Sequence, residues 1–359
     1  MCNVNRRQFL QTGGAFLTLA AEAELLAKPL PAAAMAESAK EDLLAPDIYF
    51  HEGDAVSDTA DAVCNNGWII FEDYVLVVDA NFPAGAKLII SKIRALTDKP
   101  IRFAFDTHHH GDHAYGNQIF VDNGGVPVAH AGVVDEMKKY ETGYYGNTPG
   151  RWEAALKDRP DLKATKLKPP SVLFSKDLVF DDGKHRVELL YLGVSHTHGD
   201  AVAWLPNERI LFTGDMCVNG PYNFVGDGDT GKWITTLDEA RKLNAKIVCT
   251  GHGSRSVGTV LDDQQKFFKL LREQVGTVLV QPSSPRDTKA RIESIRSTLK
   301  SNSQIARYVS DSNTGSQDGF PSQVAKVYEE LTGNKLAAID REHHLARHAH
   351  ARSHGFLSV

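Results

Sequence analysis

Four apolar segments of this chain each end in a short polar loop that carries histidine or aspartate, and this pattern constrains the fold more than any other feature. Residues 101–105 run into Thr107-His108-His109-His110-Gly111-Asp112-His113, and three later segments run into loops that contain His196, Asp215 and His252. The ends of neighbouring strands gather along one edge of a sheet, where residues distant in sequence share a site. The pattern predicts a layered α/β fold with a polar site at a strand edge.

The periodicity of the intervening sequence predicts alternating strands and helices. Strands are expected as a pair within 62–79, and then at 101–105, 126–129, 172–174, 178–180, 186–192, 201–205, 210–213 and 247–250. Helices are expected over 84–96, 230–243, 262–280, 287–299 and 321–332, with 131–170 helical and then irregular. Asp229 or Thr230 is the expected N-cap of the second helix, and Gly333 ends the last one.

Composition and charge exclude some classes of function. The 359 residues are 42% hydrophobic and 24% charged, as in soluble enzymes, and the formal net charge of −5 provides no basic field for nucleic acid. No apolar run approaches the roughly 20 residues that span a bilayer, so stable membrane insertion is not expected. A small molecule is the expected partner.

The N-terminus is typical of an export signal. Asn5-Arg6-Arg7-Gln8-Phe9-Leu10 resembles the twin-arginine motif, a weakly apolar stretch follows over 13–21, and cleavage after Ala36 would leave Glu37 first. We therefore predict a signal peptide over 1–36 and a periplasmic or otherwise exported protein. The alternative is a basic N-terminal helix.

The four cysteines do not predict a disulfide framework. Cys2 would leave with the signal, and Cys64, Cys217 and Cys249 cannot all pair. Cys217 and Cys249 stand beside candidate ligands, but we interpret them as small, buried and apolar.

The cluster at 108–113 has the spacing of metal ligands. In extended backbone, residues two apart point the same way, so His108 and His110 can hold one ion, whereas His109 points to the opposite side. Asp112 and His113 follow a glycine that lets the chain bend toward a second ion. Imidazole and carboxylate suit zinc, and they also accept iron and manganese.

Four motifs together resemble the metallo-β-lactamase superfamily over residues 48–260. They are HxHxDH at 108–113, GxxHTxGD at 193–200, TGD at 213–215 and GHG at 251–253. The resemblance implies an αββα sandwich, a four-layer α/β fold, with two divalent ions at one edge. It implies that the first ion is held by His108, His110 and His196, the second by Asp112, His113 and His252, and that Asp215 bridges both.

The resemblance also implies a hydrolytic mechanism. Two divalent ions about 3.5–4 Å apart share a water and lower its pKa, and Asp112 carries the proton of the nucleophile to the leaving group. Asp79, Asp106 and Thr107 are candidates for fixing histidine tautomers, the alternative being that they cap a turn or end a strand. Asp200 is expected to brace its loop. His198 is expected to face solvent, the alternative being that it lines the pocket.

The expected domain order is a catalytic domain over 37–260, a helical extension over 261–336 and a polar, His-rich, mobile tail over 337–359. The extension is expected to cover the pocket or to form a homodimer contact. The pocket wall is expected to come from Tyr144, Tyr145, Trp152, Asn219, Tyr222, Asn223 and Phe224.

The presence of aspartate at position 215 limits the choice of substrate. In the β-lactamases that the chain resembles, two subclasses have cysteine at this position and the third commonly has serine. We therefore predict a hydrolase of an ester, lactone, amide or related bond in a small molecule. The alternatives are weak, promiscuous β-lactamase activity, a mononuclear iron dioxygenase of the same fold, and a non-catalytic metal-binding protein.

Overall fold

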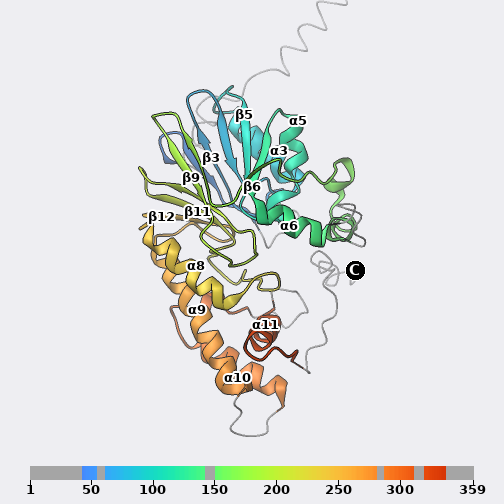
Figure 1. Ribbon diagram of the computed structural model, residues 1–359, viewed down its shortest axis with the longest axis vertical. Helices are drawn as coiled ribbons and strands as arrows, with labels where there is room; N and C mark the ends of the chain where they lie inside the picture. Colours follow the sequence, from blue (N-terminus) through green and yellow to red (C-terminus); the bar gives the residue numbers. More distant parts are fainter. Residues whose placement is uncertain (1–42, 55–60, 142–149, 281–286, 311–318, 337–359) are drawn as a thin grey trace, which may run out of the picture. The chain divides into compact units, whose positions relative to one another are not determined.

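The computed structural model describes residues 43–54, 61–141, 150–280, 287–310 and 319–336 (Figure 1). These residues form one compact unit from Leu43 onward. Two mixed sheets face each other and helices cover their outer faces, which confirms the predicted αββα sandwich with further helices after it. The predicted signal peptide and His-rich tail lie outside the described residues.

The first sheet has seven strands in sequential order. The strands are β1 (Leu43–Ala45), β2 (Ile48–His51), β3 (Asn66–Ile70), β4 (Val75–Val78), β5 (Ile101–Asp106), β6 (Val126–His130) and β7 (Val172–Phe174). Neighbours are antiparallel from β1 to β4 and parallel from β4 to β7. β1 and β2 were not predicted, because they are short and lack a clear alternating pattern.

The second sheet has five strands in the order β12-β11-β10-β9-β8. The strands are β8 (Asp177–Asp181), β9 (Arg186–Leu190), β10 (Val202–Leu205), β11 (Ile210–Gly214) and β12 (Ile247–Thr250). Only the β11–β12 pair is parallel. The parallel pair brings the carboxyl ends of both strands to the same edge, so the loops that follow them are neighbours.

Period-two alternation along the strands divides the core into layers. Ile69 and Leu76 face the second sheet, whereas Trp68 and Val77 face helices on the outer side. These outer helices are α3 (Pro83–Arg94) and α5 (Asn117–Asp122). Four further elements complete this half: α4 (Gly111–Ala114), α6 (Ala131–Tyr140), α7 (Arg151–Ala155) and η1 (Pro160–Ala164).

The outer face of the second sheet is covered by α8 (Thr230–Lys242) and α9 (Thr259–Val275), and α9 continues as η2 (Gly276–Val280). Two more helices, α10 (Thr288–Lys300) and α11 (Phe320–Thr332), pack against α9, and η3 (Ala306–Tyr308) packs against α10 (Figure 1). Their apolar faces share one core with Trp204 and Leu211 of the sheet. The predicted caps are confirmed: Asp229 accepts from the backbone N–H of Lys232, and Gly333 ends α11 with φ +72°.

None of the described helices is both long enough and apolar enough to cross a membrane.

Candidate metal centre

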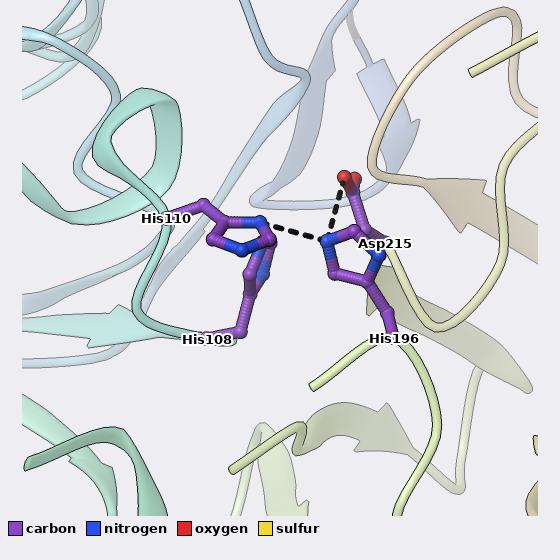
Figure 2. Close-up of side chains that lie close together, drawn as sticks. All are labelled: His108, His110, His196 and Asp215. Carbon is purple, nitrogen blue, oxygen red and sulfur yellow. Dashed lines mark hydrogen bonds and ion pairs between the residues drawn. The ribbon is translucent and has the colours of Figure 1, made fainter. Parts of the chain in front are cut away.

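The structure brings the seven predicted site residues together at the carboxyl ends of strands from both sheets. His108, His110, His196 and Asp215 present ligand atoms that all lie within 4.8 Å of one another. Figure 2 shows how these four side chains point toward one another. Asp112, His113 and His252 form a second such group.

Asp215 lies between the two groups. One of its oxygens, Oδ2, lies 3.4 Å from Nε2 of His196, in the first group. The other, Oδ1, lies 3.3 Å from Nε2 of His113, in the second group. This is the position that a carboxylate shared by two cations requires.

Glycines allow the backbone to approach this closely. At Gly214 the backbone is left-handed, with φ +50°, and an added Cβ would lie 2.2 Å from Oγ1 of Thr107. At Gly251 an added Cβ would lie 2.1 Å from Oδ1 of Asp215. Any side chain at either position would therefore separate the loops that carry the candidate ligands.

Four of the five histidines are held through the ring nitrogen that faces away from the centre. His196 Nδ1 donates to the carbonyl of Phe224 at 2.8 Å, and His110 Nε2 donates to Asp227 at 2.8 Å. His113 Nδ1 donates to Asp79 at 2.9 Å. His108 Nδ1 lies 3.1 Å from Oγ1 of Thr107, a hydroxyl that itself lies 2.8 Å from Asp79. These contacts fix the tautomers and leave the other nitrogen of each ring for a ligand.

The inward nitrogens have the chemistry of a cation site. His196 Nε2 and His110 Nδ1 lie only 2.8 Å apart, and His113 Nε2 and His252 Nε2 lie 3.4 Å apart. His108 Nε2 is buried and has no hydrogen-bond partner among the described residues. Converging imidazole lone pairs repel one another unless a proton or a cation lies between them, and carboxylates complete the donor set that Zn²⁺ prefers. The residues therefore fit a divalent metal.

The electrostatics of the metal-free site favour the ligand form of some of these groups and the protonated form of others. Burial, aided by the neighbouring imidazoles, lowers the pKa of His108 well below its usual range. Burial opposes ionisation of Asp112 and Asp215, but the histidines beside them outweigh it and hold both pKa values below the ordinary one. Burial opposes protonation of His113 and His252, but the acidic groups beside them outweigh it and raise both pKa values. Neutral imidazole and ionised carboxylate are the forms that bind metal, so a cation bound by the second group would take the place of these protons.

Asp112 is the most exposed side chain of the set. Its exposed fraction is 19%, compared with 0% for His113 and 8% for His252. Its Oδ2 lies 3.1 Å from His252 Nε2. It can therefore exchange protons with solvent while it remains in contact with the second group.

The roles expected for the surrounding residues hold only in part. Asp79 and Thr107 contact site histidines, as predicted. Asp106 fits the stated alternative, because it ends β5 and its carboxylate accepts from Asn117 Nδ2 at 2.6 Å. Asp200 braces its loop as predicted, accepting from Ser195 Oγ at 2.5 Å and also from Thr197. His198 is exposed.

Sequence reasoning missed Asp227. Besides holding His110, its carboxylate forms a two-pronged ion pair with Arg151, at 2.5 and 2.8 Å. His109 is also buried beside this pair, with Nε2 at 3.6 Å from Asp227, and its ring stacks on Tyr140. His109 belongs to neither ligand group named above, but it contacts the Asp227 and Arg151 side chains, and Asp227 holds His110. The run Asp227-Gly228-Asp229 before a helix was the available signal.

Cys64 was also missed. Its thiol belongs to a third compact group with Asp79 and His113, behind the second ligand group. Burial raises its pKa to about 12, so the thiol is neutral. Cys217 and Cys249 are buried, as predicted.

The expected pocket wall is only partly near the site. The ring of Phe224 lies 5.4 Å from that of His110, and the ring of Tyr222 lies 5.7 Å from that of His252. Trp152 packs instead in a small core with Tyr115. The remaining residues are buried (Asn223), bonded to a neighbouring loop (Asn219), or outside the described residues (Tyr144 and Tyr145).

Comparisons with known protein sequences find metallo-beta-lactamases among the relatives. The chain is 36% identical over 85 residues to a metallo-beta-lactamase type 2 of Bacteroides fragilis, a match that covers 22% of this chain and 34% of that protein. It is 24% identical over 202 residues to a metallo-beta-lactamase type 2 of Bacillus cereus, covering 54% and 69%. The chain thus spans about a third of the first relative and slightly more than two thirds of the second.

Solved structures show the likeness in fold. The DIM-1 metallo-beta-lactamase exposed to ceftazidime superposes with a TM-score of 0.50 at 18% identity, covering 63% of this chain and 94% of that one. A metallo-beta-lactamase from Pontibacter korlensis gives 0.51 at 17% identity, covering 63% and 97%. The family model described as metallo-beta-lactamase superfamily matches residues 61–252, more than half of the chain. The chain therefore belongs to the metallo-beta-lactamase superfamily.

Proposed function

We propose that this chain is a metal-dependent hydrolase that holds two divalent cations. His108, His110 and His196 would hold the first, Asp112, His113 and His252 the second, and Asp215 both. The observation that carries the proposal is the arrangement of the histidine rings: the protein holds the outer nitrogens, and the inner nitrogens converge on one another and on Asp215. Family membership supports the same reading.

The positions of Asp112 and Asp215 indicate a different role for each of these acids in the proposed reaction. Bound divalent cations supply Lewis acidity, which lowers the pKa of water toward neutrality and polarises a carbonyl or phosphoryl oxygen. Asp112, the most exposed of the set, accepts the proton of the attacking water and returns it to the leaving group. Asp215 spans the two groups and keeps them at a fixed separation.

For the substrate, we propose an ester, lactone, amide or related bond of a small molecule. The acidic overall charge disfavours nucleic acid, and Asp215 differs from the residues expected in the β-lactamase subclasses. A second candidate is weak β-lactam hydrolysis, because the two relatives described above are named metallo-beta-lactamase type 2.

A hydrolysis screen tests the proposal. The purified, zinc-loaded chain would be assayed with nitrocefin, lactones, thioesters, bis-p-nitrophenyl phosphate and aryl sulfates, with His196→Ala as the metal-site control. We expect turnover of at least one substrate, and loss of that turnover in His196→Ala and Asp112→Asn. Full activity of Asp112→Asn would remove the proton-carrying role of that residue.

Metal analysis separates the hydrolase from its alternatives. Two zinc ions per chain and no oxygen uptake support the proposal, whereas one iron and oxygen consumption would indicate a dioxygenase. Two bound metals without turnover of any substrate class would favour a metal-binding protein. Zinc is proposed because it prefers mixed imidazole and carboxylate donors.

We also propose export by the twin-arginine route to the periplasm, on the strength of the Arg6-Arg7 motif. Replacing both arginines with lysine should keep the chain in the cytoplasmic fraction. Export of the doubly substituted chain at the normal rate would contradict this. A homodimer through the C-terminal helices remains a proposal that sedimentation of the purified chain would test.

A further inference from the structure

We infer that two glutamines on the C-terminal helices, Gln264 of α9 and Gln323 of α11, are positioning residues for the first ligand group. They would act by holding residues 216–229, the segment that connects β11 to α8, against His196 and His110. We call this segment the support loop. The inference rests on the proposed metal site, and it assigns to the helical extension a part in building that site.

The support loop makes the outer contacts of two first-group histidines. The carbonyl of Phe224 accepts from His196 Nδ1 at 2.8 Å, and Asp227 accepts from His110 Nε2 at 2.8 Å. The loop also lies directly on the backbone that carries His196, since a Cβ added to Gly228 would be 2.0 Å from the carbonyl oxygen of Ser195. A shift of the loop would therefore rotate or release both imidazoles.

The helices hold the loop through buried hydrogen bonds. Gln264 accepts from the backbone N–H of Val218 at 2.8 Å and donates to Oδ1 of Asn223 at 3.0 Å. Gln323 donates to the backbone carbonyl of Asn223 at 2.8 Å. Asn223 immediately precedes Phe224, so both glutamines act one residue from the carbonyl that holds His196.

Burial indicates that these glutamines do more than pack. Gln264, Gln323 and Asn223 are all 0% exposed, beside an otherwise apolar core. An amide in such a place is costly to bury unless it is hydrogen-bonded, and an apolar side chain would fill the space at lower cost. Their bonds specify where the loop lies.

The C-terminal end of α11 is held in place as well. Glu330 accepts from the backbone N–H of Thr230 at 3.0 Å and from Arg272 Nη1 at 2.6 Å, which joins α11 to both α8 and α9. Gln323 therefore projects from a helix with a defined position. The superfamily match ends at residue 252, before α9 begins, so these contacts come from a part of the chain that the family model does not cover.

The test replaces each glutamine with methionine, which has a similar length and a high helix propensity but makes no comparable hydrogen bonds. The variants are Gln264→Met, Gln323→Met and the double variant. Gln265→Met is the matched control, because Gln265 is the next residue of α9, is 5% exposed, and donates to Ile234 of α8 instead of to the loop.

Two measurements are made on each full-length chain. Hydrogen exchange of the metal-free protein reports the support loop directly, and competition with a chelator reports the affinity for each of two zinc ions. We expect faster exchange over 216–229 and about 10- to 100-fold weaker binding of one zinc ion in the Gln264 and Gln323 variants. Binding of the other ion, and both properties of Gln265→Met, should match the unsubstituted chain.

The outcomes are distinguishable. If the unsubstituted chain binds two zinc ions and the Gln264 and Gln323 variants bind both equally well, the positioning role is overturned while the proposed function stands. The same holds if Gln265→Met weakens binding as much as they do. If the unsubstituted chain binds no metal, the proposed function fails and this inference fails with it.

Discussion

Asp79 Oδ2 lies 2.9 Å from His113 Nδ1, and Oδ1 of the same carboxylate accepts from the backbone N–H of Thr107 at 2.8 Å. One buried acid thus fixes the ring of a second-group candidate ligand and the backbone just before the first group. Asp79 does so from a left-handed backbone, with φ +64°, directly after β4. Strained backbone at a non-glycine residue persists where its side chain is needed in one place.

Asp79→Asn should selectively lower the affinity of the second ligand group for its metal ion. Asparagine tolerates the left-handed backbone, but its single carbonyl oxygen cannot accept from both His113 and Thr107. We expect about 10- to 100-fold lower affinity for one of two zinc ions, measured by chelator competition. Asp47→Asn is the control, because Asp47 also has positive φ, at +62°, and lies on a turn between β1 and β2. Equal effects of the two substitutions would contradict a specific role for Asp79.

Asp227→Ala should lower both the affinity for metal and the free energy of unfolding. It removes the acceptor of His110 and leaves the Arg151 guanidinium, whose side chain is 21% exposed, without its carboxylate. We expect a loss of about 3 kcal/mol in the free energy of unfolding, the lower end for a broken buried pair. Asp262→Ala breaks the Arg241–Asp262 pair, in which both side chains are more than 40% exposed, and should cost less than about 1 kcal/mol. Urea denaturation of the metal-free proteins measures the difference.

The sequence was sufficient to predict which side chains gather at this strand edge, although their role as ligands stays a prediction. His108, His196, Asp215 and His252 each follow an apolar strand at a glycine-containing loop, so local pattern alone places them at strand ends. The boundaries of the five longer predicted helices were predicted to within a few residues for the same reason, since caps such as Asp229 and Gly333 are local signals. The short helices α4 and α5 were not predicted. Ligand positions and element ends depend on short-range chemistry that a single sequence displays.

Local sequence pattern could not identify the residues that contact the candidate ligands from outside. Asp227 lies 117 positions from the histidine that it holds, and Gln323 lies 100 positions from Asn223. Asp106 looked as suitable as Asp79, because both end strands, and only the packing of Asn117 against Asp106 separates their roles. Which acid contacts which imidazole depends on how two sheets and a helical layer pack, and one sequence does not show that packing.

Removing metal should lower the thermal stability of the chain. Ligands that bind only the folded state stabilise it by about 4 kcal/mol per site when present at 1,000 times their Kd. For a chain of this size we expect Tm to fall by about 5 °C or more when a chelator is added, and to recover with zinc. A His108→Ala/His110→Ala variant loses two inward nitrogens of the first group, so its chelator-dependent change should be smaller. A Tm that responds to neither chelator nor zinc would contradict the presence of a metal site.

Glu141 is not one of the candidate ligands, and it predicts a pH dependence of stability. Its side chain is buried, and it accepts from the Tyr115 hydroxyl at 2.7 and 2.8 Å and from the backbone N–H of Trp152 at 2.9 Å. Burial raises the pKa of this carboxyl to about 7 from its ordinary value of 4.5, against the effect of those donors. The folded chain therefore retains a proton that the unfolded chain has already released.

The sign of the effect follows from proton linkage. Between pH 4.5 and about 7 the folded state binds more protons at Glu141 than the unfolded state does, so the contribution of this group to stability falls as pH rises through that window. The total change is on the order of 3 kcal/mol. Glu141→Gln removes the titration and keeps the side chain polar. We expect the free energy of unfolding of the unsubstituted chain, relative to this variant, to decrease between pH 5 and pH 8, both measured by urea denaturation with chelator present. Parallel pH profiles for the two proteins would show that the Glu141 carboxyl titrates at the same pH in the folded and unfolded chain.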